Sequence, residues 1–208
     1  MHKSSRNFNK KEIEYHKKRQ NLIDSVDSTT VAEAPFLFTS YSQITELYTT
    51  VRIFDLCKDI TGNIVECGTF KGNSLMLYAN LFDNLTPYVV EKKIIGFDTF
   101  NGFDDSFINE EKDAASTNNI NNSMFKNRFP PFFNYDLLKK SIDVHDTRRP
   151  LGHIQKIELV KGDACKTIPK YVEDNPELVI SLLYLDFDLY EPTKIALEHL
   201  YNRVVKGG

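Results

Sequence analysis

The feature that most constrains the fold of this sequence is a repeated alternation between short apolar runs and longer amphipathic segments. Four runs have the length and β-branched content of buried strands: 64–67, 93–97, 157–160 and 179–185. Three of these runs are followed by segments with apolar residues at helical spacing: 74–85, 164–173 and 193–205. Strands that alternate with helices indicate a parallel sheet covered on both faces. We therefore predict an α/β fold with a doubly wound, mostly parallel sheet.

The remaining segments define the domain organisation. The 208 residues are enough for one domain rather than two. Residues 1–35 are polar and charged, and we expect an N-terminal tail or accessory helix there; the core would cover 36–208, with its first helix over 36–60. A segment rich in Asn, Phe and charge, 104–152, separates the second and third strands, with a helix predicted over 134–143. An insertion of this length is usually a functional lid or a disordered insert, and its aromatic content favours a lid.

Charge and hydropathy limit the classes of partner. The formal net charge is −3, from 26 basic and 29 acidic side chains, so the chain has no overall field that attracts nucleic acid. A basic cluster within residues 3–19 could contact lipid headgroups or nucleic acid, but such clusters are more often solvated. The start has no apolar run typical of a secretory signal, and no stretch reaches membrane-spanning length. We expect a cytoplasmic protein with a small-molecule partner, no nucleic acid and no membrane.

The first candidate site is the turn that follows the first predicted strand, Glu66-Cys67-Gly68-Thr69-Phe70-Lys71-Gly72-Asn73-Ser74. Its glycines allow the backbone to approach a ligand, and the following helix offers free N–H groups. The spacing fits neither G-x-G-x-x-G nor the phosphate loop, but it matches the E-x-G-x-x-x-G form of S-adenosylmethionine enzymes. A plain turn between strand and helix is the alternative. The candidate cofactor-binding residues are Glu66, Gly68, Thr69, Gly72, Asn73 and Ser74.

The ends of the second and third strands also carry acids. Asp98, followed by Thr99, comes where a carboxylate can accept hydrogen bonds from both hydroxyls of a ribose. An Asx-turn or a helix N-cap is the alternative for Asp98. Asp163, followed by Ala164, either contacts an adenine edge or caps the next helix. For Asp98 and for Asp163, the sequence alone does not decide between contact with a ligand and a structural role in a turn or cap.

Two acids, Asp186 and Asp188, follow the fourth predicted strand. In an extended chain this spacing points both carboxylates to one face, at the end of the sheet where open α/β proteins bind ligands. Two close carboxylates that stay ionised need a cation or hydrogen-bond donors. An oxygen-ligated divalent metal such as Mg²⁺ meets that need, and a pair of capping acids is the alternative.

Together these segments resemble the macrocin O-methyltransferase (TylF/MycF-like) family, which has the Rossmann-like fold of class I S-adenosylmethionine-dependent methyltransferases. The resemblance covers about 36–208, and Asp186-Phe187-Asp188-Leu189-Tyr190-Glu191-Pro192-Thr193 is its most diagnostic motif. It implies methyl transfer from S-adenosyl-L-methionine to a sugar hydroxyl of a nucleotide sugar, a glycosylated natural product or a surface polysaccharide. It also implies that Asp186 binds Mg²⁺ and that Asp188 is the general base. A homo-oligomer is compatible with this interpretation.

The sequence departs from that family pattern at Gly207-Gly208. In the family this pair leads into a further strand with an acidic pair that completes the metal site, so we expect the fold and the metal site of this chain to be incomplete. Three interpretations are open: the chain is a fragment of a longer product, a partner completes it, or it is an inactive remnant. Two alternatives remain. One is a metal-independent or nicotinamide-linked Rossmann enzyme, and the other is a non-catalytic or truncated Rossmann-like binding module that keeps the cofactor fold.

Overall fold

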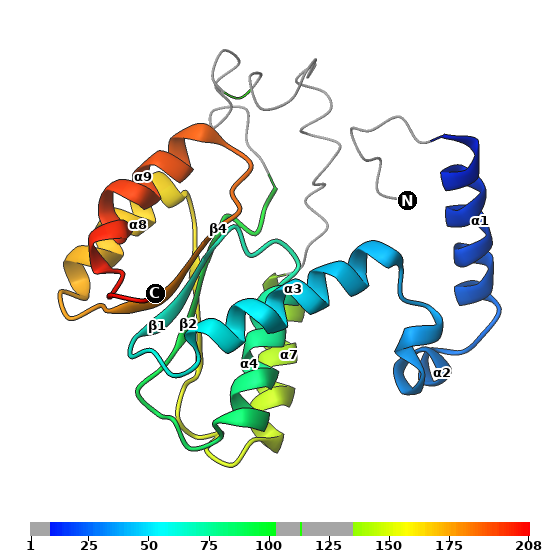
Figure 1. The fold of residues 1–208 in the computed structure, drawn as a ribbon, viewed down its shortest axis with the longest axis horizontal. Coiled ribbons are helices and arrows are strands. Elements are labelled where there is room, and N and C mark those ends of the chain that lie inside the picture. The colour runs from blue at the N-terminus through cyan, green and yellow to red at the C-terminus, as the bar shows by residue number, and fades with distance from the viewer. Residues whose placement is uncertain (1–8, 103–112, 114–134) are drawn as a thin grey trace. The chain divides into compact units, whose positions relative to one another are not determined.

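The computed structural model describes residues 9–102, 113 and 135–208, shown in Figure 1. Most of the predicted lid-like insert, 104–152, therefore lies outside the described residues, and its role as a lid stays a prediction. The chain divides into two compact units, 1–49 and 50–208.

The first unit is helical. It contains α1 (Lys10–Asp24), α2 (Ser28–Glu33), the short 3-10 helix η1 (Pro35–Leu37) and the first part of α3 (Tyr41–Cys57), which continues into the second unit. Asn9 and Glu12 form a capping box at the start of α1, which satisfies backbone N–H groups that the helix leaves open. In its described part, 9–35, the region predicted as a tail or accessory helix thus holds α1 and α2.

The second unit is built on a parallel sheet of four strands in the order β3-β2-β1-β4. The strands are β1 (Asn63–Cys67), β2 (Ile94–Asp98), β3 (Ile157–Lys161) and β4 (Ile180–Leu185). Each predicted strand is confirmed to within one residue at either end. Among the described residues every strand pair is parallel.

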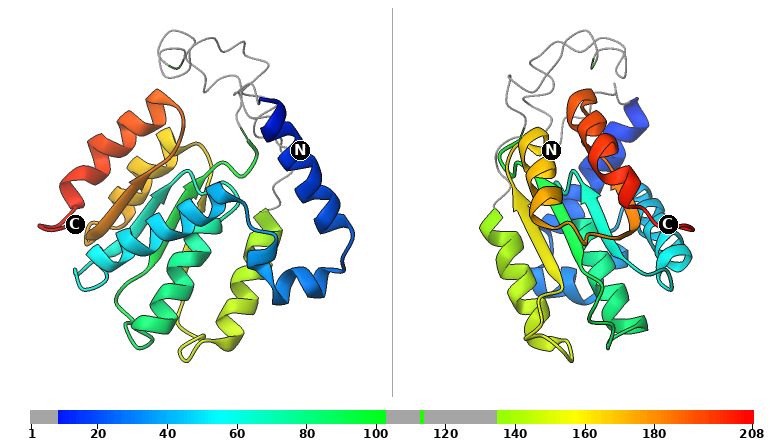
Figure 2. Two further views of the ribbon diagram at one scale, coloured as in Figure 1. Left: turned by 45° about the vertical axis from the view of Figure 1, so that its right-hand side comes forward. Right: turned by 90° about the vertical axis from the view of Figure 1, so that its left-hand side faces the viewer.

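Helices cover both faces of this sheet. They are α4 (Asn73–Leu85), α7 (Tyr135–Arg148), α8 (Ala164–Asp174) and α9 (Tyr190–Leu200). Figures 1 and 2 show α8 and α9 on one face, with α4 and α7 on the other. The doubly wound α/β fold predicted from the sequence is therefore confirmed.

Successive strand side chains pack into two separate cores, as the alternation of a pleated strand requires. Ile64 and Ile94 face a core with Phe54 of α3, whereas Val65 and Phe97 face a core with α8 and α9. The sheet is thus buried on both sides, which explains why its strands read as continuous apolar runs.

Three of the predicted helices have other boundaries in the structure. The last helix, predicted over 193–205, runs from Tyr190 to Leu200. It ends early because Val204 forms a parallel bridge with Ile180, the first residue of β4, and the Val205 N–H donates to the Ile180 carbonyl at 3.0 Å. The helix predicted from residue 36 begins at Tyr41, since Pro35–Leu37 forms the 3-10 helix. The helix predicted over 134–143 continues to Arg148.

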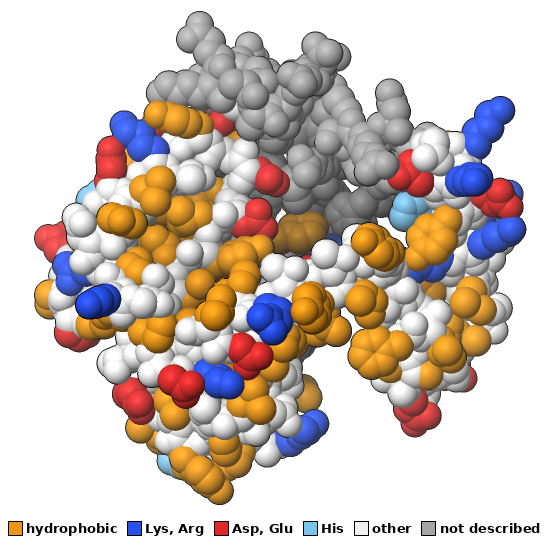
Figure 3. Space-filling view, viewed as in Figure 1, with side chains coloured by type: hydrophobic (Ala, Val, Ile, Leu, Met, Phe, Trp, Pro, Cys, Tyr) orange, Lys and Arg blue, Asp and Glu red, His pale blue; other side chains and the backbone are white. Residues whose placement is uncertain are grey.

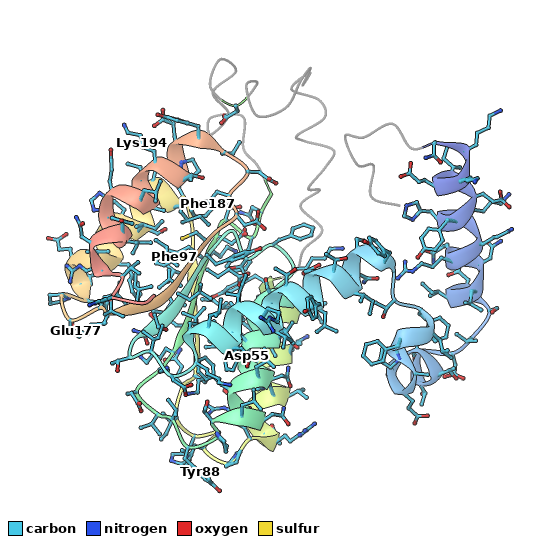
Figure 4. The ribbon with its side chains drawn as sticks, viewed as in Figure 1. Asp55, Tyr88, Phe97, Glu177, Phe187 and Lys194 are labelled. Carbon is cyan, nitrogen blue, oxygen red and sulfur yellow. The ribbon has the colours of Figure 1, made fainter. Side chains whose placement is uncertain are left out.

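The strand register brings the carboxyl ends of all four strands to one edge of the sheet. Cys67 pairs with both Phe97 and Leu185, and Asp98 pairs with Lys161. Figure 4 labels Glu177, which precedes β4, and Phe187, which follows it, at opposite ends of the sheet. The candidate residues that follow each strand therefore lie along the same edge.

The surface matches the small net charge. On the face shown in Figure 3, acidic and basic side chains are interspersed with hydrophobic ones over α8 and α9. Within the described part of the chain, no helix combines the length and hydropathy needed to cross a bilayer.

Candidate active site

The loop after β1 lies directly against the segment after β4. The N–H of Asp186 donates to the Cys67 carbonyl at 2.7 Å. A Cβ built on Gly68 would lie 2.2 Å from the Asp186 carbonyl oxygen, and Gly68 has a φ of 95°. Only glycine fits this close approach. The structure thus brings the predicted cofactor loop and the first predicted acid into backbone contact.

Glu66 links β1 to the start of α4. Its side chain is fully buried, and Ser74 Oγ donates to Glu66 Oε1. Thr69 is also buried, and its Oγ1 has no hydrogen-bond partner among the described residues. A Cβ on Gly96 would lie 2.7 Å from this Oγ1, so the glycine in β2 makes room for it. Thr69 is therefore a polar group at the loop that a ligand could satisfy.

Gly72 ends the loop in the left-handed conformation and caps α4, which begins at Asn73. Its φ is 72°, and a Cβ there would lie 2.5 Å from Leu138 Cδ1. Leu138 is buried on α7. The absence of a side chain at position 72 thus lets α7 pack against the cofactor loop.

Asp98 holds two loops at once. Its Oδ2 accepts a hydrogen bond from the Phe70 N–H at 2.8 Å, and its Oδ1 accepts one from the Phe100 N–H at 2.7 Å. Phe70 and Phe100 have φ values of 48° and 53°, in the left-handed region. That conformation costs a non-glycine residue about 1–2 kcal/mol. A hydrogen bond to an ionised group contributes about 1.5–3 kcal/mol, so each bond offsets the cost at its own residue.

The environment of Asp98 bears on its predicted ribose contact. Burial raises the pKa of its carboxyl, and the N–H groups of Phe100 and Phe70 partly oppose that rise. The contact with Phe100 is the Asx-turn that was the alternative interpretation. The Thr69 N–H and the Thr99 hydroxyl also lower this pKa, so the carboxylate is already engaged with both loops before a ribose hydroxyl would reach it. Thr99 Oγ1 donates to the Gly102 carbonyl at 2.8 Å and so supports the same turn.

Asp163 caps α8, and its side chain accepts a hydrogen bond from the Cys165 N–H at 3.0 Å. Ala164, the first residue of α8, is buried. The structure therefore shows the capping alternative for Asp163, and its adenine contact stays a prediction.

Asp186 and Asp188 are both exposed beyond the end of β4. Asp188 has a φ of 59°, so the chain is not extended there. Side-chain alternation along a strand therefore does not apply to this pair, and it no longer supports the prediction that both carboxylates share one face. Non-glycine residues in left-handed conformations are concentrated at functional sites. Phe70, Phe100 and Asp188 all lie just beyond strand ends.

The donor chemistry of the acid segment suits Mg²⁺ only in part. Mg²⁺ prefers oxygen ligands and is commonly bound through one or two carboxylates, with waters and substrate oxygens completing its shell. Asp186 and Asp188 supply such oxygens. Across residues 9–102, 113 and 135–208, however, no three His, Cys, Asp or Glu side chains come together in a group that could hold a metal. The residues thus fit a partial Mg²⁺ site.

Sequence reasoning missed the backbone roles of Phe70 and Phe100, and it missed Asp113. The sequence did carry a signal for the two aromatic residues, since a glycine, Gly72 or Gly102, follows each of them two positions later. In the structure both glycines have positive φ. Asp113 is buried, and its Oδ1 accepts a hydrogen bond from the Tyr190 N–H at 2.7 Å, at the start of α9. We find no local sequence pattern that predicts this contact.

Solved structures of methyltransferases are similar to this chain. A crystal structure of CalS11, a calicheamicin methyltransferase, is 30% identical, with a TM-score of 0.83, over 97% of this chain and 77% of that chain. An apo structure of CalS11, a TDP-rhamnose 3′-O-methyltransferase of calicheamicin biosynthesis, is 28% identical, with a TM-score of 0.75 and the same coverage. The O-methyltransferase NovP shares the fold. It is 18% identical, with a TM-score of 0.61, over 80% of this chain and 64% of that chain. Curated proteins gave no match.

The fold and the site at the carboxyl edge of the sheet, with these structural neighbours, define the protein as a methyltransferase. The model of the macrocin-O-methyltransferase (TylF) family matches residues 40–208, and the chain belongs to that family.

Proposed function

We propose that this protein is an S-adenosyl-L-methionine-dependent O-methyltransferase that acts on a sugar hydroxyl, with Asp188 as general base and Asp186 as a ligand of Mg²⁺. The observation that carries the proposal is the backbone contact between Gly68 and Asp186, which puts the cofactor loop beside the acid segment. CalS11 is described as a TDP-rhamnose methyltransferase, which supports a sugar-containing acceptor such as a nucleotide sugar.

The cofactor loop fits S-adenosyl-L-methionine better than a nucleotide phosphate. Gly68 and Gly72 have positive φ, and Thr69 Oγ1 is a buried polar atom that has no partner among the described residues. Asp98 supplies carboxylate oxygens at the next strand end, where the ribose of a nucleoside binds in open α/β sheets. When bound, S-adenosyl-L-methionine supplies a methyl group on a cationic sulfur.

The acid segment would activate the acceptor. A sugar hydroxyl is a poor nucleophile at neutral pH, and a carboxylate such as Asp188 can remove its proton as the new bond to the methyl group forms. Mg²⁺ held by Asp186 would lower the pKa of that hydroxyl. Both acids are exposed beyond β4, so an acceptor can approach them from solvent.

The test is Asp188→Asn, assayed for methyl transfer to nucleotide sugars including TDP-rhamnose. Asparagine tolerates the left-handed conformation of residue 188, so the backbone should be kept. We expect methyl transfer to fall about 10²–10⁴-fold, the usual worth of a general base, while the affinity for S-adenosylhomocysteine is unchanged. Glu198→Gln, at an exposed carboxylate on α9, is the matched control.

Two results would contradict the proposal. Full methyl transfer by the Asp188→Asn variant would exclude Asp188 as the base. A folded protein that binds neither S-adenosyl-L-methionine nor S-adenosylhomocysteine in calorimetry would exclude the cofactor. Cofactor binding without transfer to any acceptor would instead favour the non-catalytic binding module.

A further inference from the structure

The two turns at the cofactor site share one geometry and one acceptor. Phe70 lies in the loop after β1 and Phe100 in the loop after β2, and both are left-handed. Their N–H groups donate to the two different oxygens of one carboxylate, that of Asp98. Each aromatic residue precedes a glycine of positive φ by two positions. A single side chain thus joins two loops that come from neighbouring strands.

We propose that Asp98 is a positioning residue that holds both loops in their left-handed conformations and so keeps the cofactor site formed before any ligand binds. The inference rests on the proposed function, since it concerns the same cofactor site. It assigns to Asp98 a role in the unliganded protein, in addition to the predicted contact with ribose. In the liganded protein a ribose hydroxyl would share the carboxylate with these backbone donors.

The side chains show which loop depends most on Asp98. The ring of Phe100 is buried and packs on the Tyr135 ring of α7, with centroids 5.0 Å apart. Core packing therefore helps to fix Phe100. Phe70 is 39% exposed, so burial fixes it less than it fixes Phe100. The loop after β1 is therefore the one whose conformation should respond to the loss of the carboxylate.

The first experiment measures the unliganded protein directly. Asp98→Asn replaces one of the two carboxylate oxygens by an NH₂ group that cannot accept a hydrogen bond. We expect amide hydrogen exchange, followed by NMR, to show at least about tenfold lower protection at Phe70 or Phe100 than in wild type. Asp163→Asn is the control, because the Asp163 carboxylate caps α8 by accepting a hydrogen bond from the Cys165 N–H. Unchanged protection at both amides in Asp98→Asn would overturn the inference.

The second experiment separates backbone conformation from ribose contact. Phe70→Ala and Phe70→Gly both remove the ring, but only glycine adopts the left-handed conformation at no cost. With Asp98 present, the two variants should bind S-adenosylhomocysteine with nearly equal affinity. In the Asp98→Asn background, the glycine variant should bind about five- to thirtyfold more tightly than the alanine variant, because the alanine loop populates the competent conformation less.

The outcomes distinguish this inference from the proposed function. If the ratio of the affinities of Phe70→Gly and Phe70→Ala for S-adenosylhomocysteine is the same with Asp98 as with Asp98→Asn, Asp98 does not hold the loop. That result would stand even if Asp98 binds ribose. If the wild type binds no S-adenosylhomocysteine, the proposed function fails, and the exchange measurement still decides the role of Asp98. If Asp98→Asn does not fold, Asp98→Asn with Phe70→Gly takes its place, and protection at both residue 70 and Phe100 equal to that in Phe70→Gly alone would overturn the inference.

Discussion

Gly68 and Asp186 touch through their backbones. The carbonyl oxygen of Asp186 occupies the space that a side chain at position 68 would need, at 2.2 Å from an ideal Cβ. A parallel sheet explains the contact, since β1 and β4 are neighbours and their carboxyl ends coincide. The loop that we assign to the cofactor and the acids that we assign to the acceptor are thus held together by the sheet itself.

Gly68→Ala should be strongly destabilising because it combines a left-handed backbone with a clash against backbone atoms. The conformational cost is about 1 kcal/mol or more, and overpacking adds about 1–3 kcal/mol. Gly207→Ala is a matched control, since Gly207 has nearly the same φ, 94°, but its Cβ would meet only Ile60 Cδ1 at 3.6 Å. Urea denaturation should show the larger loss of unfolding free energy for Gly68→Ala. Equal losses would contradict the clash.

Asp98 should make stability depend on pH. Burial raises its pKa above 3.8 in the folded protein, so the folded state binds the proton more tightly than the unfolded chain. The stabilisation from this group is therefore present below 3.8 and is lost as the pH rises through the folded pKa. The unfolding free energy of wild type, relative to Asp98→Asn, should fall across this window in denaturation series. A relative stability that rises with pH would show that hydrogen bonding outweighs burial.

Lys156 should stabilise the amino-terminal end of the sheet. It is buried, and its Nζ donates to the Lys92 carbonyl at 2.9 Å and to the Val89 carbonyl, with the Phe82 ring centroid 5.1 Å away. Lys156→Met leaves those carbonyls without their donor, which costs about 1–3 kcal/mol of unfolding free energy.

The control for this substitution is Lys194→Met on α9, where the side chain is 48% exposed and pairs with Glu198 at 3.6 Å. An exposed pair of this kind contributes about 0–1 kcal/mol. Thermal or urea unfolding of both variants makes the comparison. If the two losses are the same size, the buried ammonium contributes nothing specific.

Asp83 and His145 should couple α4 to α7. Asp83 Oδ2 lies 2.8 Å from His145 Nε2, with side chains only 15% and 8% exposed. A double-mutant cycle with Asp83→Asn and His145→Gln should give a coupling free energy of about 1 kcal/mol or more. The exposed pair of Glu14 and Lys18, at 2.7 Å, should give about 0.3–0.5 kcal/mol in the same assay. A smaller value for the half-buried pair of Asp83 and His145 would mean that its desolvation cancels its attraction.

The sequence was sufficient for those parts of the fold that depend on local pattern. The strands were predicted closely because buried parallel strands are continuous apolar runs bounded by turn residues. Their shared carboxyl edge also followed, but the contact of Gly68 with Asp186 depends on β4 lying beside β1, which was not predicted. The end of the last helix did not, because Val204 and Val205 suit a helix by spacing but are drawn into contact with β4.

The finer geometry of the site depends on contacts between loops, which periodicity does not report. Asp98 was predicted as a ligand group or a turn residue, but its bond to Phe70 joins two separate loops. The left-handed conformation of Asp188 is equally invisible in a pattern of two acids after a strand. Asp113 accepts a hydrogen bond from Tyr190, which is 77 positions away in the sequence. The residues next to Asp113 and Tyr190 give no pattern that predicts this contact.

The packing of Leu138 into the space at Gly72 has a consequence for how this protein can vary. Because Leu138 Cδ1 would lie 2.5 Å from a Cβ at position 72, the two positions share a single volume. A larger residue at position 72 can be accommodated only if position 138 holds a smaller one. The positive φ at position 72 also disfavours any residue other than glycine there. Sequence drift in α7 is therefore limited by the cofactor loop, although α7 itself supplies none of the residues assigned to the reaction.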